Sequence, residues 1–249
     1  MVNILSVKNL NCGNIFNNIS FNITEKSFNI LVGKNGVGKT ALIYAILGLT
    51  KYQGDINFKY RREDIGCISD FSEIMEDNAF EYLSKPLKNL NYSEGKVKKT
   101  IYGITKKLGI EDLLEKNSNE LNNEEKLMML LTHSIIHNPK LVIIDNTLDE
   151  LHESNKIKFI NYLISMNASV ILVTNDSRYF KYANKILVMT KSKVEIIREK
   201  TSIKKLENLL VKNNSELPFS LELSHKLYAY GVVKELYNNN SELVDNIWK

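Results

Sequence analysis

One eight-residue stretch combines the residue types that bind phosphate. It contains three glycines, a lysine and a hydroxyl, in the order Gly33, Lys34, Asn35, Gly36, Val37, Gly38, Lys39 and Thr40. Glycines let the backbone curl so that its N–H groups point at phosphate oxygens. Lys39 would reach the β- and γ-phosphates of a nucleotide, and the Thr40 hydroxyl would bind Mg²⁺. The stretch therefore predicts a phosphate-binding loop (P-loop).

The residues on either side predict the two elements that must hold this loop. An apolar run typical of a β-strand, Phe28–Val32, precedes it, and a helical pattern, Ala41–Leu47, follows it. Strand, glycine loop and helix in this order are the context that a P-loop needs. The first helical turn would add unpaired N–H groups and the positive end of the helix dipole. A glycine-rich turn that matches the pattern by chance is the weaker interpretation.

A second candidate is Asp145, which ends the apolar run Leu141–Ile144. Four consecutive apolar residues are typical of a buried parallel strand. A carboxylate at the carboxyl end of such a strand would lie beside the phosphate loop and hold Mg²⁺ through water. An acid at a strand end is usually a helix cap or a loop residue. Together with the upstream P-loop, however, we interpret Asp145 as a Mg²⁺ ligand.

The order of the predicted elements indicates an α/β fold. We expect strands at Asn3–Val7, Asn18–Ile23, Gly54–Phe58, Asp64–Ser69, Lys140–Asp145, Ala168–Thr174, Lys185–Met189 and Lys193–Ile197. We expect helices over about residues 71–136 and over Glu153–Met166. The first strands would form an antiparallel sheet, and the later alternation of strands and helices predicts a mostly parallel sheet flanked by helices. The apolar segment Leu127–Ile136 is expected in the core.

Composition excludes several other classes of protein. The chain has 249 residues, of which 43% are hydrophobic, a formal net charge of +4, and no apolar run near the ~18 residues of a membrane span. No signal-peptide pattern opens it. Cys12 and Cys67 lie far apart and are interpreted as buried small residues in a reducing compartment. The lysines are mixed with glutamates, so we expect solvated faces and no nucleic-acid partner. His133 and His137 have helical spacing but no evident third metal ligand.

These motifs and their spacing resemble an ATP-binding subunit of an ABC transporter, over residues 1 to about 200. The family's signature, usually LSGGQ, corresponds to Leu121, Asn122, Asn123, Glu124 and Glu125, and Asn138-Pro139-Lys140 follows in register. The resemblance implies a P-loop ABC-ATPase fold that binds ATP and Mg²⁺. It also implies a peripheral protein on the cytoplasmic face of the membrane. Each P-loop would face the signature of a second ATPase subunit, in a homo- or heterodimer that docks on transmembrane subunits.

The end of the chain sharpens the resemblance. Residues 213–219, a following helix through Leu223 and Leu227, and Gly231 resemble the C-terminal extension of energy-coupling factor (ECF) ATPases, which drive vitamin and metal-ion importers. We expect a nucleotide-binding domain over residues 1–199, with a helical subdomain at about 71–136, and a helical extension over 200–249. Pro218 would begin one helix, and Asn240 or Ser241 would cap the last.

Several positions depart from the family pattern. Asp70 stands for a glutamine that contacts Mg²⁺, Asn146 for the catalytic glutamate, and Asn175 for the switch histidine. An amide positions water but does not accept its proton. His152 stands for the aspartate of the D-loop, the segment after the catalytic glutamate. Asp70 and Asn175 would otherwise be caps, and His152 an ordinary loop residue.

The signature and the adenine site are altered as well. Asn122, Asn123 and Glu124 replace the signature serine and glycines. A carboxylate at position 124 would repel the partner's phosphate by about 1 kcal/mol in water and by several at a protein-like dielectric. No aromatic residue for adenine is evident between Leu10 and Phe16, and Phe16 is expected in the core.

These departures leave open whether the chain itself hydrolyses ATP. We expect an importer subunit paired with a more complete ATPase. The alternatives are an ATP-binding pseudo-ATPase with a regulatory role and a non-transport ABC protein. A small-molecule kinase is disfavoured, because its lid would need arginines and Arg61 and Arg62 are the only paired ones.

Overall fold

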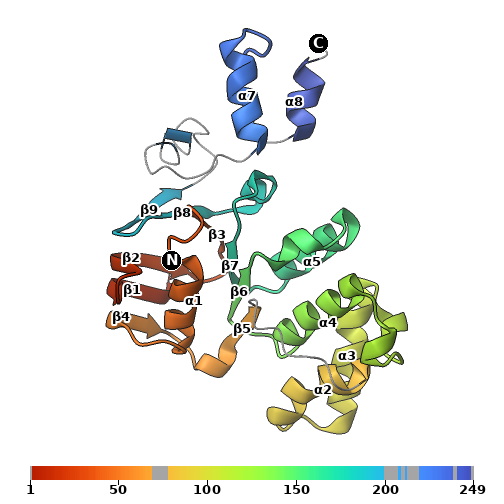
Figure 1. The fold of residues 1–249 in the computed structure, drawn as a ribbon. Coiled ribbons are helices and arrows are strands. Elements are labelled where there is room, and N and C mark those ends of the chain that lie inside the picture. The colour runs from red at the N-terminus through yellow and green to blue at the C-terminus, as the bar shows by residue number, and fades with distance from the viewer. Residues whose placement is uncertain are drawn as a thin grey trace. The chain divides into compact units, whose positions relative to one another are not determined.

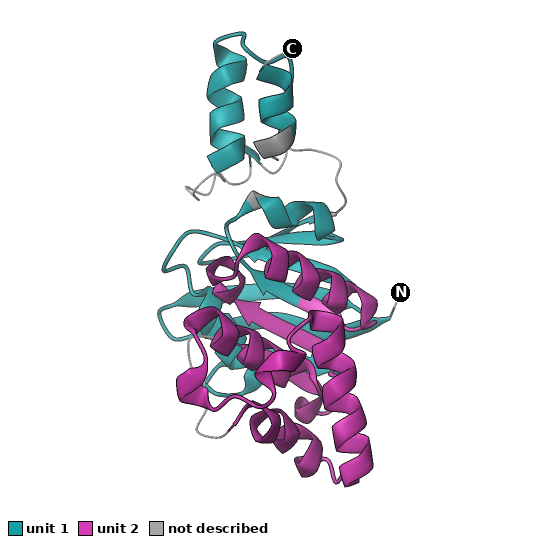
Figure 2. Cartoon of the chain, turned by 90° about the vertical axis from the view of Figure 1, so that its right-hand side faces the viewer, with its two compact units in different colours: residues 1–59, 171–249 teal, residues 60–170 magenta. Residues whose placement is uncertain are grey.

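The computed structural model describes residues 2–68, 78–198, 207–208, 211, 219–237 and 240–247. The chain divides into two compact units, which Figure 2 shows in different colours. Unit 1 consists of residues 1–59 and 171–249, and unit 2 consists of residues 60–170. The two units are described separately below.

The antiparallel sheet of unit 1 confirms the predicted N-terminal sheet. Its strands are β1 (Asn3–Cys12), β2 (Phe16–Thr24) and β4 (Gln53–Phe58), in the order β2-β1-β4 (Figure 1). β1 continues past Val7, where alternation predicted its end. The register shifts between Val7 and Leu10, and Asn9 adopts a left-handed φ of 47°. This bulge interrupts the alternation and returns Leu10 to the buried face.

A second set of strands in unit 1 carries the P-loop. β3 (Phe28–Val32) pairs in parallel with β8 (Lys185–Met189), which pairs antiparallel with β9 (Val194–Arg198). On its other side β3 neighbours β7 (Ser169–Val173). The boundary between the units falls within β7, after Val170. Every residue of β3 is buried, as its nearly continuous apolar pattern predicts. The helix α1 (Lys39–Leu47) and the 3-10 helix η5 (Ser177–Tyr182) belong to the same unit.

Unit 2 combines parallel strands with helices. β5 (Ile65–Ile68) pairs in parallel with β6 (Leu141–Asp145), and β6 neighbours β7. The helices are α2 (Ala79–Asn89), α3 (Glu94–Leu108), α4 (Asn123–Ile135) and α5 (Glu153–Ser165). Short 3-10 helices lie in the connecting segments of this unit: η1 (Arg62–Asp64), η2 (Glu111–Leu113), η3 (Ser118–Glu120) and η4 (Thr147–Glu150). α2 packs against both α3 and α4 (Figure 1), which confirms the helical character predicted for most of residues 71–136.

The packing of α4 confirms that its apolar residues belong to the core. Met128, Met129 and Leu131 are at most 1% exposed. On the same helix, the His133 ring stacks on Tyr82, with centroids 4.3 Å apart and planes inclined by 21°. Burial first, and then the charges of His137 and Lys85, lower the pKa of His133 to about 4. The histidine is therefore a neutral packing residue near pH 7.

The end of the chain contributes two helices to unit 1. α7 (Phe219–Ala229) and α8 (Asn240–Ile247) lie side by side (Figure 1), and α7 also contacts η5. α7 buries Leu221 and Ser224, whereas Leu223 and Leu227, the two leucines that marked this helix in the sequence, are only half-buried. Ser224 can be buried because its hydroxyl accepts a hydrogen bond from the Tyr237 N–H at 2.7 Å. The predicted helix start at Pro218 lies outside the described residues. No helix in the described ranges is both long and apolar enough to cross a membrane.

Candidate nucleotide site

The P-loop joins β3 to α1 in unit 1, as predicted. Gly38 is the N-cap of α1 with a φ of 104°, and Gly36 has a φ of 77°, both in the left-handed region that favours glycine. A Cβ on Gly33 would lie 2.6 Å from the Met189 carbonyl oxygen. A Cβ on Gly38 would lie 2.6 Å from the Ile15 side chain. The loop conformation thus requires glycines, and its tip, Lys34 to Gly36, is exposed.

Lys39 points back into the loop. Its Nζ donates hydrogen bonds to the carbonyl oxygens of Gly33, at 2.6 Å, and of Lys34, at 3.3 Å. The residue is only 8% exposed, so these dipoles stabilise a charge that burial would otherwise penalise. Thr40 follows as the second residue of α1 and is half-buried. A buried ammonium, a helix N-terminus and a glycine cradle together fit a bound polyphosphate.

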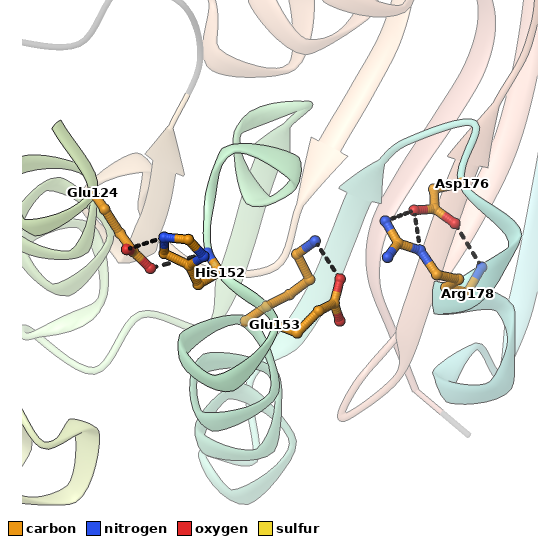
Figure 3. Close-up of polar contacts among 6 residues, drawn as sticks. Glu124, His152, Glu153, Asp176 and Arg178 are labelled. Carbon is orange, nitrogen blue, oxygen red and sulfur yellow. Dashed lines mark hydrogen bonds and ion pairs between the residues drawn. The ribbon is translucent and has the colours of Figure 1, made fainter. Parts of the chain in front are cut away.

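Asn175 lies against the same loop. Its Oδ1 accepts a hydrogen bond from the Gly33 N–H at 3.3 Å, although the two residues are 142 positions apart. The alternative that Asn175 caps the following turn is wrong, because Asp176 caps η5 and accepts from the Arg178 N–H at 2.8 Å. An ion pair between the same two side chains closes this turn (Figure 3). The structure thus brings the substituted switch position to the P-loop.

Ile15 is a neighbour of the loop that sequence reasoning missed. Its side chain is 43% exposed and lies next to Gly38, whereas Phe16 is 1% exposed and confirms the predicted core role. A large exposed aliphatic side chain beside a phosphate loop is suited to packing against a nucleobase. The sequence pointed to Ile15 only through its position between Leu10 and Phe16, the segment in which an aromatic residue for adenine was expected.

In unit 2, Asp145 ends β6 and is 2% exposed. The Asn146 Nδ2 donates a hydrogen bond to the Asp145 Oδ1 at 3.0 Å. Asn146 itself adopts a left-handed φ of 55°. Burial first, and then the charge of Asp145, raise the pKa of the Cys67 thiol to about 12. Asp145 is thus a buried carboxylate of the kind that binds Mg²⁺. Asp70, the third substituted position, lies outside the described residues.

The signature-like stretch forms the start of α4 in unit 2. Leu121 is buried, and Asn122 is the N-cap of α4 in a capping box with Glu125. The two reciprocal hydrogen bonds of this box are both 2.9 Å long. A hydrogen bond from Lys116, at 2.8 Å, is the largest of the effects that hold the pKa of Glu125 below its usual range. Asn123 is exposed in the first turn.

Glu124 contacts its own chain. Its Oε1 accepts hydrogen bonds from the His152 N–H at 2.9 Å and from the Asn155 Nδ2 at 2.8 Å. The His152 Nε2 lies 3.4 Å from the other oxygen (Figure 3). Burial tends to raise the pKa of Glu124, but these hydrogen bonds and the His152 ring together hold it below its ordinary value. Sequence patterns did not predict this contact, which joins residues 28 positions apart.

Comparison with known proteins identifies the family. The ABC transporter profile matches residues 16–149, more than half of the chain. The energy-coupling factor transporter ATP-binding protein EcfA1 of Ureaplasma parvum serovar 3 is 27% identical, over 94% of this chain and 86% of its own. The lipoprotein-releasing system ATP-binding protein LolD of Buchnera aphidicola is 30% identical, over 67% of this chain and 82% of its own.

A solved structure agrees in fold. The structure of cbiO1 from Clostridium perfringens, described as part of the ABC transporter complex cbiONQ, matches with a TM-score of 0.72 at 21% identity. The match covers 86% of this chain and 95% of cbiO1. The P-loop geometry, the profile match and these relatives show that the chain belongs to the ABC transporter family, as an ATP-binding domain.

Proposed function

We propose that this chain is the ATP-binding subunit of an ECF-type importer on the cytoplasmic face of a membrane. The proposal is supported by the share of this chain that aligns with each relative. The ECF relative from Ureaplasma spans 94% of the chain, whereas LolD spans 67%. An alignment of 94% reaches well into residues 200–249, the proposed helical extension. The name of the solved neighbour, part of an ABC transporter complex, points to the same kind of assembly.

The observation that carries the proposal is the P-loop around Lys39. ATP would bind with its phosphates on residues 33–40 and its base against Ile15, which lies beside Gly38. Lys39 would exchange the carbonyls of Gly33 and Lys34 for phosphate oxygens. Thr40 and Asp145 would hold Mg²⁺, which supplies positive charge to the phosphates when it is bound.

Hydrolysis by this chain alone is expected to be very slow. Asn146 donates to Asp145 and carries no group that accepts a proton from water. Asn175 offers an amide where the family has a histidine, and Asp70 replaces a glutamine. We therefore propose a heterodimer in which the second ATPase subunit carries an intact glutamate and histidine. The P-loop of this chain would then hold ATP to close the pair.

Two surfaces would connect the chain to its partners. The helical region of about residues 71–120 would transmit closure to transmembrane subunits. The extension would contact the second ATPase, since Phe219, Tyr230 and Val244 are 72%, 83% and 51% exposed. Large exposed apolar side chains of this kind are candidates for contact with a partner protein.

The experiment is purification of the tagged chain from detergent-extracted membranes of its own cells. We expect a second ATPase and a membrane protein with several spanning helices to co-purify in stable ratio. The matched control is the chain deleted after Lys200, which should lose the ATPase partner. Recovery of ribosomes or DNA instead would support a non-transport ABC protein and contradict the proposal.

The second candidate is an ATP-binding pseudo-ATPase with a regulatory role, favoured by Asn146 and Asn175. Reconstitution separates the two. A transporter subunit should support ATP-dependent uptake when it is combined with its partners in vesicles, and uptake should fall when Lys39→Ala is used. A regulatory module would bind ATP equally well but leave uptake unchanged when its P-loop is disabled.

A further inference from the structure

The first turn of α5 lacks a cap from its own N-cap residue. The N-cap is His152, with the extended φ of −61° and ψ of 148° usual for that position, but its side chain makes no capping hydrogen bond. The first N–H groups of a helix have no partner within the helix and need acceptors. Asp, Asn, Ser and Thr commonly supply them, and histidine does not.

Glu124, from the start of α4, supplies an acceptor instead. One carboxylate oxygen accepts from both the His152 N–H, at 2.9 Å, and the Asn155 side chain, at 2.8 Å. Figure 3 shows the carboxylate directed at His152 from the neighbouring helix. The Glu124 side chain is 21% exposed, and that of His152 is 85% exposed. The backbone at position 152 is therefore held while the imidazole stays available at the surface.

The segment that ends at His152 begins at the proposed Mg²⁺ ligand. It leaves β6 through Asn146, whose side chain binds Asp145, and continues through η4. Leu148 and Leu151 are 1% and 4% exposed and anchor its middle. At its far end, Glu124 accepts a hydrogen bond from the backbone N–H of His152, the N-cap of α5.

We propose that Glu124 is a positioning residue, which caps α5 from outside and so ties residues 146–152 to the start of α4. The signature-like stretch and the segment after Asp145 then move as one piece. This role of Glu124 goes beyond the proposed function, because it involves contacts within one chain and needs neither nucleotide nor partner.

This role also changes the interpretation of the negative charge at position 124. A carboxylate free to face a partner's phosphate would repel it, but this one is bound to two donors of its own chain. If the carboxylate acts as a cap, Glu124→Gln should retain most of its effect, since an amide oxygen also accepts both hydrogen bonds.

Hydrogen exchange of the isolated chain, followed by mass spectrometry, tests the proposal. Glu124→Ala should speed exchange of the amides of residues 152–156 by about fivefold, the factor of a typical N-cap, while Glu124→Gln stays near wild type. Glu150→Ala, which removes an exposed acid from the same segment, is the matched control and should change nothing there.

The decisive variant adds a cap to α5 directly. His152→Asp in the Glu124→Ala background should restore slow exchange in residues 153–156, because an aspartate at an N-cap accepts from the N–H groups of the first turn. General loosening of α4 would not be repaired by this second change. The proposal is overturned if Glu124→Ala leaves these amides unchanged, or if His152→Asp fails to restore their protection. Failure of nucleotide binding would affect neither result.

Discussion

Acid should destabilise unit 2 through His133, and the structure gives the size of the effect. The folded pKa of about 4, caused first by burial and then by the charges of His137 and Lys85, lies below the ordinary value of 6.5. Between pH 6.5 and pH 4 the unfolded chain therefore binds a proton at His133, whereas the folded chain does not. The contribution of neutral His133 to the free energy of unfolding is present above about pH 6.5 and is lost as the pH falls from 6.5 towards 4. The loss from this residue reaches about 2.5 kcal/mol near pH 4.5, from 1.36 kcal/mol for each pKa unit.

Urea unfolding followed by circular dichroism measures this loss. We compare wild type with His133→Phe, which keeps a ring against Tyr82 but removes the titrating group. The variant should lose about 2.5 kcal/mol less than wild type between about pH 7.5 and about pH 4.5. His137, whose pKa burial also lowers against the opposing charge of Asp64, adds a loss of the same sign in both proteins.

The reasoning is refuted if His133→Phe and wild type lose the same free energy between the two pH values. Different stabilities at neutral pH would not matter, because the prediction concerns only the change with pH in each protein.

Three further predictions concern the nucleotide site and the extension. Asn146→Glu with Asn175→His should raise ATP turnover by about a hundredfold, at the low end for a restored general base, and an unchanged rate would point to a further lesion. Ile15→Tyr should tighten ATP binding by about fivefold in calorimetry, through base stacking, and unchanged affinity would mean that the base binds elsewhere. Deletion after Lys200 should preserve ATP binding but weaken association with the second ATPase in analytical ultracentrifugation. Unfolding, or unchanged association, would make the extension an internal support.

Local patterns predicted the elements that hold the P-loop. The run Phe28–Val32, three glycines and a following helix are all adjacent in sequence, so their geometry follows from short-range rules. The same is true of the strand that ends at Asp145. The bulge at Asn9 shows the limit, because a change in register removes the alternation by which a strand is recognised.

Contacts between distant residues escaped prediction. The Gly33 contact of Asn175 spans 142 positions, and the Glu124 contact of His152 spans 28. A pattern of residue types does not encode which side chains meet across such separations. The buried face of α7 was missed for a related reason. A serine is polar by type, but Ser224 is buried because a distant N–H pairs with it.

Binding of Mg-ATP by the P-loop underlies every proposed role of this chain, and thermal unfolding with and without the nucleotide measures it. Mg-ATP at about a hundred times its dissociation constant should stabilise wild type by about 2.7 kcal/mol and raise its melting temperature. Lys39→Ala should melt at the same temperature with and without Mg-ATP, whereas Lys8→Ala, an exposed control on β1, should respond as wild type does. The absence of any shift in wild type at millimolar Mg-ATP, or an equal shift in Lys39→Ala, would contradict the proposed function.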